Sequence, residues 1–133
     1  MSIPTTTLRK SLGATADVAK LWFESRTEPK SRAVFEAKGK LGDDGNGAVY
    51  VYFDKNDNAL YVGLTSRKVK CRLHDQTSPH KKKPWWKDWT TMRFVQLSDD
   101  MDRQIMEFLL ILSYSPKHNE KPKAKNLDEL LPA

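Results

Sequence analysis

The stretch that decides the fold is AVYVYFDKNDNALYVGLTS, residues 48–66. Its first six residues are rich in Val, Tyr and Phe, a composition typical of a β-strand. Residues 54–58 are polar and include two asparagines, which favour a turn. Residues 59–64 have a strand composition again. The stretch therefore predicts a β-hairpin.

The segments after the hairpin alternate between helix and strand. Thr65-Ser66 is a suitable N-cap for a helix over residues 67–76. Residues 92–97 alternate as a third strand. A run of one serine and two aspartates (98–100) then caps a long helix that reaches about residue 114. Its expected core stripe is Ile105, Phe108, Leu109 and Leu112.

The N-terminal third is expected to stand apart from these elements. Val18, Leu21 and Trp22 fall on one face of a helix that begins near residue 14. Pro29 should end this helix, because the residue before a proline avoids the α region. The glycine-rich run at residues 42–47 then breaks the chain.

Together these elements predict an α+β fold. We expect a small three-stranded antiparallel sheet flanked by helices, with a short helical N-terminal appendage. The appendage (a tail plus the helix) would span residues 1–46, the main domain residues 47–122, and a C-terminal tail residues 123–133.

The positive charge is concentrated in one part of the chain. The 133 residues carry 23 Lys and Arg against 17 Asp and Glu, a net charge of +6. Residues 66–87 contain eight basic side chains and a single acidic one. A local patch of one sign favours a polyanionic partner such as DNA, with a solvated lysine-rich surface as the alternative. The expected phosphate contacts are Arg67, Lys68, Lys70, Lys81, Lys82, Lys83 and Lys87.

The composition excludes several other classes. Apolar runs such as residues 108–112 are too short to span a membrane. Cys71 is the only cysteine, so the chain has no intrachain disulfide and no cysteine-rich zinc site. A reducing, cytoplasmic location is expected. The Trp85-Trp86 pair is more typical of packing than of base stacking, and we expect at least one of the two to be buried.

Two residues stand out for their chemistry. Glu107 interrupts an apolar run and has Arg103 and Leu110 as helical neighbours. Its carboxylate should therefore pair with Arg103, lie at the edge of the stripe, or bind a cation. Gly63 lies inside a strand, which indicates either a bulge or a group that approaches the backbone closely.

These features occur in an order that resembles the GIY-YIG nuclease family. The segments AVY (48–50) and YVG (61–63) are similar to the paired strand motifs of that family, with eleven positions from one tyrosine to the next. Arg72 on the following helix resembles the family's essential arginine. Glu107 and the segment PKHN (116–119) resemble its glutamate helix and its terminal Pro-x-x-Asn.

The resemblance covers residues 47–122 and implies a metal-dependent DNA endonuclease. Tyr50 would be the general base and Tyr61 would orient water or phosphate, although the two roles could be exchanged. Arg72 would stabilise the charge of the transition state. Glu107 would hold one divalent cation, Mg²⁺ or alternatively Mn²⁺, and Asn119 would order the phosphate or the loop near the metal.

One position departs from the family pattern. Members often carry a histidine four residues after the arginine, where this chain has Gln76. His74 or His80 could replace it. A catalytically silent nucleic-acid-binding module on the same scaffold is therefore the alternative function. No membrane partner is expected, RNA is a weaker expectation than DNA, and a homodimer is one route to a double-strand cut.

Overall fold

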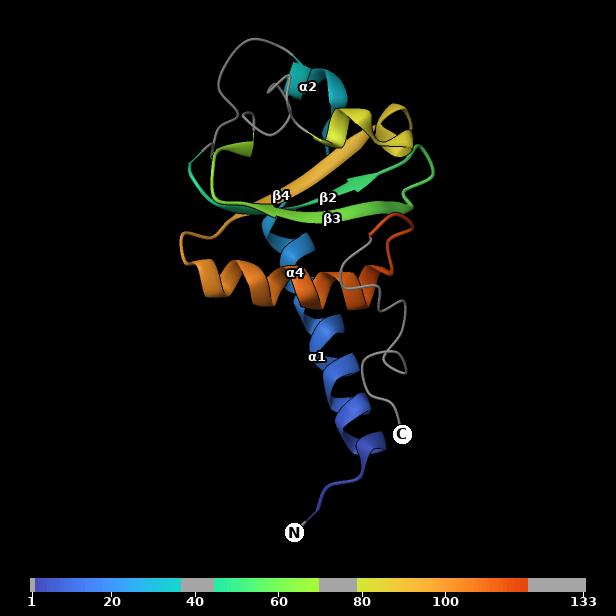
Figure 1. Cartoon of the computed structure of the whole chain (residues 1–133), viewed down its shortest axis with the longest axis vertical. Coiled ribbons are helices and arrows are strands. Elements are labelled where there is room, and N and C mark those ends of the chain that lie inside the picture. Colours follow the sequence, from blue (N-terminus) through green and yellow to red (C-terminus); the bar gives the residue numbers. More distant parts are fainter. Residues whose placement is uncertain (1, 37–44, 70–78, 120–133) are drawn as a thin grey trace.

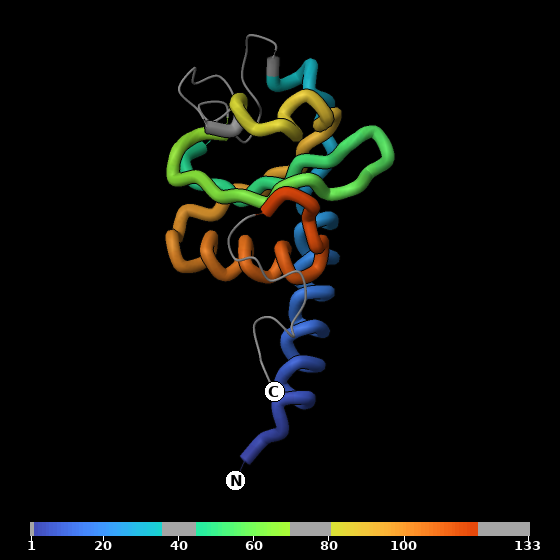
Figure 2. Tube along the Cα trace, turned by 45° about the vertical axis from the view of Figure 1, so that its right-hand side comes forward, coloured from blue at the N-terminus to red at the C-terminus, as the bar shows by residue number. Residues whose placement is uncertain are grey.

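The protein, seen in a computed structural model that describes residues 2–36, 45–69 and 79–119, has an α+β fold with an antiparallel sheet of four strands in the order β1-β4-β2-β3. Helices α1 and α4 cover one face of the sheet, and α2 with two short 3-10 helices covers the other (Figure 1). Figure 2 shows the same layers after a 45° turn. The elements are α1 (Thr5–Arg26), β1 (Lys30–Ser31), α2 (Arg32–Glu36), β2 (Ala48–Phe53), β3 (Ala59–Thr65), η1 (Pro79–Lys82), η2 (Pro84–Lys87), β4 (Thr91–Gln96) and α4 (Asp100–Tyr114).

The predicted hairpin and third strand are confirmed, and β2 lies at the centre of the sheet. Every residue of β2 is buried, because β3 and β4 flank it and both of its faces are covered. Val49 and Val51 pack with α4 on one face. Tyr50 and Tyr52 pack with the tryptophans of the η2 region on the other. Side chains that alternate along β2 thus form two separate cores.

The expected count of three strands is wrong, because a fourth strand comes from the N-terminal third. Lys30 and Ser31 pair with Met92 and Thr91 of β4. The backbone N–H of Arg32 continues the pairing by donating to the carbonyl of Thr90 at 2.9 Å. A strand of two residues has too short a pattern to be visible in the sequence.

The N-terminal helix differs from its prediction in both length and orientation. It begins at Thr5, and the residues it buries are Ala16, Ala19 and Phe23. Of the three residues on the expected face, Val18 and Leu21 are 64% and 69% exposed, whereas Trp22 is half-buried and packs against the core. Small alanines let α1 lie close against α4, and the hydroxyl of Tyr114 donates to a carboxylate oxygen of Glu24 at 2.6 Å across this contact.

The last helix has the predicted bounds but presents a different side to the sheet. The Asp99 carboxylate caps its first turn by accepting from the N–H of Asp102. The buried residues are Arg103, Leu110 and Ile111, whereas Ile105 of the predicted stripe is 51% exposed. Apolar residues occur on several sides of α4, so the sequence pattern alone does not identify the buried side. Packing against the sheet determines which side is buried.

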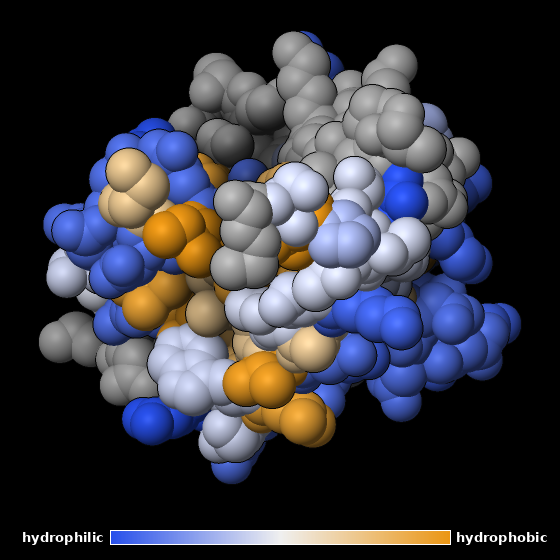
Figure 3. Space-filling view, turned by 90° about the horizontal axis from the view of Figure 1, so that it is seen from below, coloured by the Kyte–Doolittle hydropathy of each residue, from blue (hydrophilic) through white to orange (hydrophobic). Residues whose placement is uncertain are grey.

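Several apolar side chains of α1 and α4 are exposed, among them Val18, Leu21 and Ile105. Viewed from below, the molecule shows hydrophobic surface bordered by hydrophilic residues (Figure 3). No helix within the described part of the chain is both long and apolar enough to cross a bilayer.

Candidate functional site

The register of the hairpin places Tyr50 directly opposite Gly63. A Cβ atom at Gly63 would lie 2.6 Å from the Tyr50 hydroxyl oxygen and 2.7 Å from the ring carbon that bears it. Only a residue without a side chain leaves room for the phenol in this position. The glycine in the strand is therefore explained by the close approach of Tyr50.

Both tyrosines of the expected site lie on the aromatic face of the sheet. Tyr50 is 1% exposed and contacts Tyr52 edge-to-face, with ring centroids 5.4 Å apart. Tyr61 is half-buried and stacks on Trp85 at 5.2 Å with an interplanar angle of 15°. Trp85 is 2% exposed, which confirms that at least one residue of the tryptophan pair is buried. Of the two tyrosines, only Tyr61 is partly exposed.

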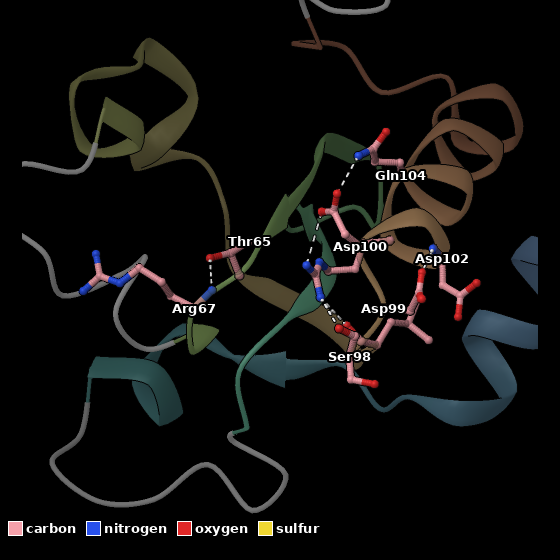
Figure 4. Close-up of polar contacts among 9 residues, drawn as sticks. Thr65, Arg67, Ser98, Asp99, Asp100, Asp102 and Gln104 are labelled. Carbon is pink, nitrogen blue, oxygen red and sulfur yellow. Dashed lines mark hydrogen bonds and ion pairs between the residues drawn. The ribbon is translucent and has the colours of Figure 1, made fainter.

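Glu107 is half-buried on the inner side of α4, next to Arg103 and Ile111. The expected ion pair with Arg103 does not form. Arg103 instead donates to the carbonyls of Leu97 and Ser98, at 2.7 and 3.0 Å, and pairs with Asp100 at 3.2 Å (Figure 4).

No hydrogen bond or ion pair from within residues 2–36, 45–69 or 79–119 reaches the carboxylate of Glu107. Burial without a compensating cation raises the pKa of Glu107. A carboxylate in this state is well suited to gain a cation, since a positive charge would offset the cost of its burial.

Asn119 binds the edge of the sheet through its side chain. Its Oδ1 accepts from the backbone N–H of Val62 at 2.8 Å, and its Nδ2 donates to the carbonyl of the same residue at 2.7 Å. The N–H groups of Lys117 and His118 donate to the carbonyls of Ala59 and Leu60. Asn119 therefore orders the segment after α4 along the outer edge of β3.

The expected catalytic residues are distributed around β3. Tyr50 of β2 and Tyr61 of β3 lie on the aromatic face of the sheet, Asn119 lies at the outer edge of β3, and Glu107 is on the helix that covers the opposite face. Arg72 lies outside the described residues, as do Lys70, His74 and Gln76, and the same holds for the side chain of His80.

The donor set is compatible with a hydrated Mg²⁺ ion. In the described part of the chain, no three His, Cys, Asp or Glu side chains come together. A cation held by Glu107 would therefore take most of its ligands from water or from a phosphate, which is how Mg²⁺ commonly binds to a single carboxylate.

The expected phosphate contacts that the structure describes fall into two groups, one on η1 and η2 and one just after β3. Lys81, Lys82 and Lys87 are exposed on η1 and η2, and Lys83 is half-buried between them. Arg67 and Lys68 are exposed just after β3. Figure 4 shows the Arg67 side chain pointing away from Asp99, Asp100 and Asp102.

Sequence reasoning missed Arg32, which holds the tryptophan region in place. Its guanidinium lies 5.2 Å from the centroid of the Trp86 ring and 4.7 Å from that of Trp89. It also donates to the Trp86 carbonyl at 2.7 Å. Fifty-four residues separate Arg32 from Trp86, so no local pattern could have revealed the contact.

Comparisons with protein-family models, with curated proteins and with solved structures find no significant match to this chain.

Proposed function

We propose that this protein is a metal-dependent DNA endonuclease of the GIY-YIG type, which hydrolyses phosphodiester bonds. The observation that carries the proposal is the Glu107 carboxylate, half-buried on α4 and without a partner among the described residues. A cation would relieve this unfavourable burial. Glu107 is also the residue that the resemblance assigns to the metal.

The divalent cation, when bound, would offset the charge that develops on the leaving oxygen. The protein's own part is to position the phosphate and to move a proton. Tyr61 reaches the surface whereas Tyr50 is buried, so exposure favours Tyr61 as the tyrosine that contacts the attacking water. Tyr50 would then act as a positioning residue through its contact with Gly63.

The phosphate would have to be within reach of Tyr61, Glu107 and Arg72. Tyr61 is on the aromatic face of β3 and α4 packs against the other face. The phosphate would lie beside the outer edge of β3, because β3 is the last strand of the sheet and the segment that carries Asn119 lies along it. Arg72 would approach the same phosphate from the segment that follows β3 and stabilise its added negative charge.

The test is nicking of supercoiled plasmid DNA in Mg²⁺ and in EDTA. We expect the wild type to nick only in Mg²⁺, and Glu107→Gln to lose roughly 100-fold or more, since a metal contributes several kcal/mol to such a transition state. Asp102→Asn is the matched control, because Asp102 is an exposed carboxylate on the same helix. Persistent nicking by Glu107→Gln would overturn the assignment.

A catalytically silent nucleic-acid-binding module is the second candidate. The separation of Tyr50 and Glu107 by the sheet favours it, because a tyrosine packed in an aromatic core serves stability first. A wild type that retards DNA in a salt-sensitive way but never nicks it would support this function. Gln76→His would then test whether activity can be restored.

A further inference from the structure

A pocket of about 460 Å³ lies over the η2 region, on the aromatic side of the molecule. This volume is within the usual range for small-ligand sites. Its lining combines cations with flat rings: Lys81, Lys83, Lys87, Trp85, Trp86 and His118. Asp88 is the single acidic residue in the lining.

The rings of this pocket are held rigidly before any ligand binds. Trp85 stacks on Tyr61 at 5.2 Å and lies nearly parallel to His118 at 6.4 Å. Arg32 fixes Trp86 through its carbonyl and its ring. Preorganised aromatic walls reduce the ordering cost of binding.

The lining indicates the chemistry of the ligand. Lysine side chains attract anions, and the faces of indole rings stack on planar groups. A nucleotide has both parts, a planar base and an anionic phosphate. Bases in an intact duplex are stacked on one another and present only their edges, so the ring surfaces of the pocket suit an unpaired base.

We propose that this pocket binds an unpaired nucleotide of a DNA strand, with the base against Trp86 and the flanking phosphates on Lys81 and Lys87. The inference rests on the proposed function for its choice of DNA, and it names the substrate class as DNA with unpaired nucleotides. The pocket includes His118, which adjoins Asn119 at the edge of β3, so an unpaired nucleotide here would place the neighbouring phosphates near the proposed catalytic edge.

The test measures binding in EDTA, where no cleavage is possible. Fluorescence anisotropy of the full chain is measured with labelled dT15, a 15-base-pair duplex and the RNA U15, and with dTMP as an unlabelled competitor. We expect dT15 to bind more tightly than the duplex. Trp86→Ala should weaken dT15 binding about fivefold or more, as one stacked base predicts, and leave the duplex unaffected.

Two further variants keep the test decisive if Trp86→Ala is poorly folded. Trp86→Tyr retains a flat ring and should bind dT15 nearly as well as the wild type. Lys81→Gln/Lys87→Gln changes only exposed side chains and should weaken dT15 binding, whereas Lys10→Gln/Lys55→Gln, with the same change of charge elsewhere, should not.

Four results would overturn the proposal. The first is equal binding of the duplex and dT15, and the second is a folded Trp86→Ala that binds dT15 like the wild type. The third is competition by dTMP as strong as that by dT15, and the fourth is binding of U15 as tight as that of dT15. The plasmid assay is independent of these results. A wild type that binds dT15 selectively but does not nick plasmid DNA would refute the nuclease and support the pocket. A wild type that nicks plasmid DNA but binds duplex and dT15 equally would refute the pocket alone.

Discussion

Tyr50 can take its position only because Gly63, opposite it, has no side chain. Tyr50 is 1% exposed, and its hydroxyl oxygen lies only 2.6 Å from the position that a Cβ of residue 63 would take. Its position therefore depends on the glycine opposite it as well as on its own packing. Any role of Tyr50 in chemistry would depend on the same contact.

Gly63→Ala tests this dependence. The added methyl cannot be accommodated by rotating a flexible chain end, since it meets an aromatic ring at 2.6–2.8 Å. We expect a loss of about 1–3 kcal/mol in the free energy of unfolding, as for other overpacked sites, measured by urea denaturation. Gly45→Ala is the control, because there the nearest atoms belong to the mobile end of Gln96. Tyr50→Ala should make Gly63→Ala nearly neutral, and additive costs in that double-mutant cycle would contradict the contact.

Glu107 has a stability effect whose sign depends on pH. Its pKa is raised in the folded state by burial, so the protonated form favours folding. The stabilising contribution is complete below the ordinary value of 4.5 and is lost as the pH rises through the folded-state pKa. At neutral pH the charged carboxylate therefore opposes folding.

Glu107→Gln should accordingly be more stable than the wild type at pH 7.5, with the difference shrinking as the pH falls toward 4.5. Thermal unfolding across this range measures the effect. Mg²⁺ should narrow this difference, because a cation at ten times its dissociation constant stabilises the wild type by about 1.4 kcal/mol. The variant has no carboxylate at position 107 to bind the cation. Equal responses of the two proteins to Mg²⁺ would argue against a metal at Glu107.

At the scale of elements, the sequence predicted those whose signal is local. The hairpin, the third strand and the bounds of α4 follow from composition, turn residues and a cap, and all are confirmed. The buried sides of α1 and α4 were not predicted correctly. Leu21 and Ile105 belong to the apolar patterns of these helices but are exposed in the structure. The candidate site residues could be named from the sequence because each lies in a short motif of neighbouring residues. The contact of Arg32 with Trp86 and that of Asn119 with Val62 depend on tertiary structure alone.

Asn119 offers a prediction about the edge of β3. Both polar atoms of its amide bind the backbone of Val62, so Asn119→Ala should leave a half-buried N–H and carbonyl without their protein partners. We expect a loss of about 1–3 kcal/mol, measured by chemical denaturation. Lys117→Ala keeps the backbone bond to Ala59 and removes only an exposed side chain, so it should cost less than about 0.5 kcal/mol. A stable Asn119→Ala that has lost activity would indicate a role in chemistry beyond this contact.

At the scale of the whole molecule, the η2 pocket carries three lysines and one aspartate, Asp88. Lysines of η1 and η2 lie on the aromatic side, and the aspartates at the start of α4 point elsewhere. A strand of DNA bound over the η2 pocket would meet cations without first meeting these carboxylates. Such a surface should bind through the release of counterions from a defined set of phosphates.

The salt dependence of binding can distinguish such a surface from a general effect of net charge. For dT15 in EDTA, each phosphate contact contributes roughly 0.7 to the slope of log K against log [NaCl], so Lys81→Gln/Lys87→Gln should reduce the slope by up to about 1.4. Lys10→Gln/Lys55→Gln lowers the net charge by the same two units at exposed positions on α1 and on the β2–β3 turn, and should leave the slope unchanged. If both pairs reduced the slope equally, the DNA would be responding to the charge of the whole molecule. A reduction confined to Lys81 and Lys87 would place the strand on the surface beside Trp86, because counterions are released only where phosphates and cations meet.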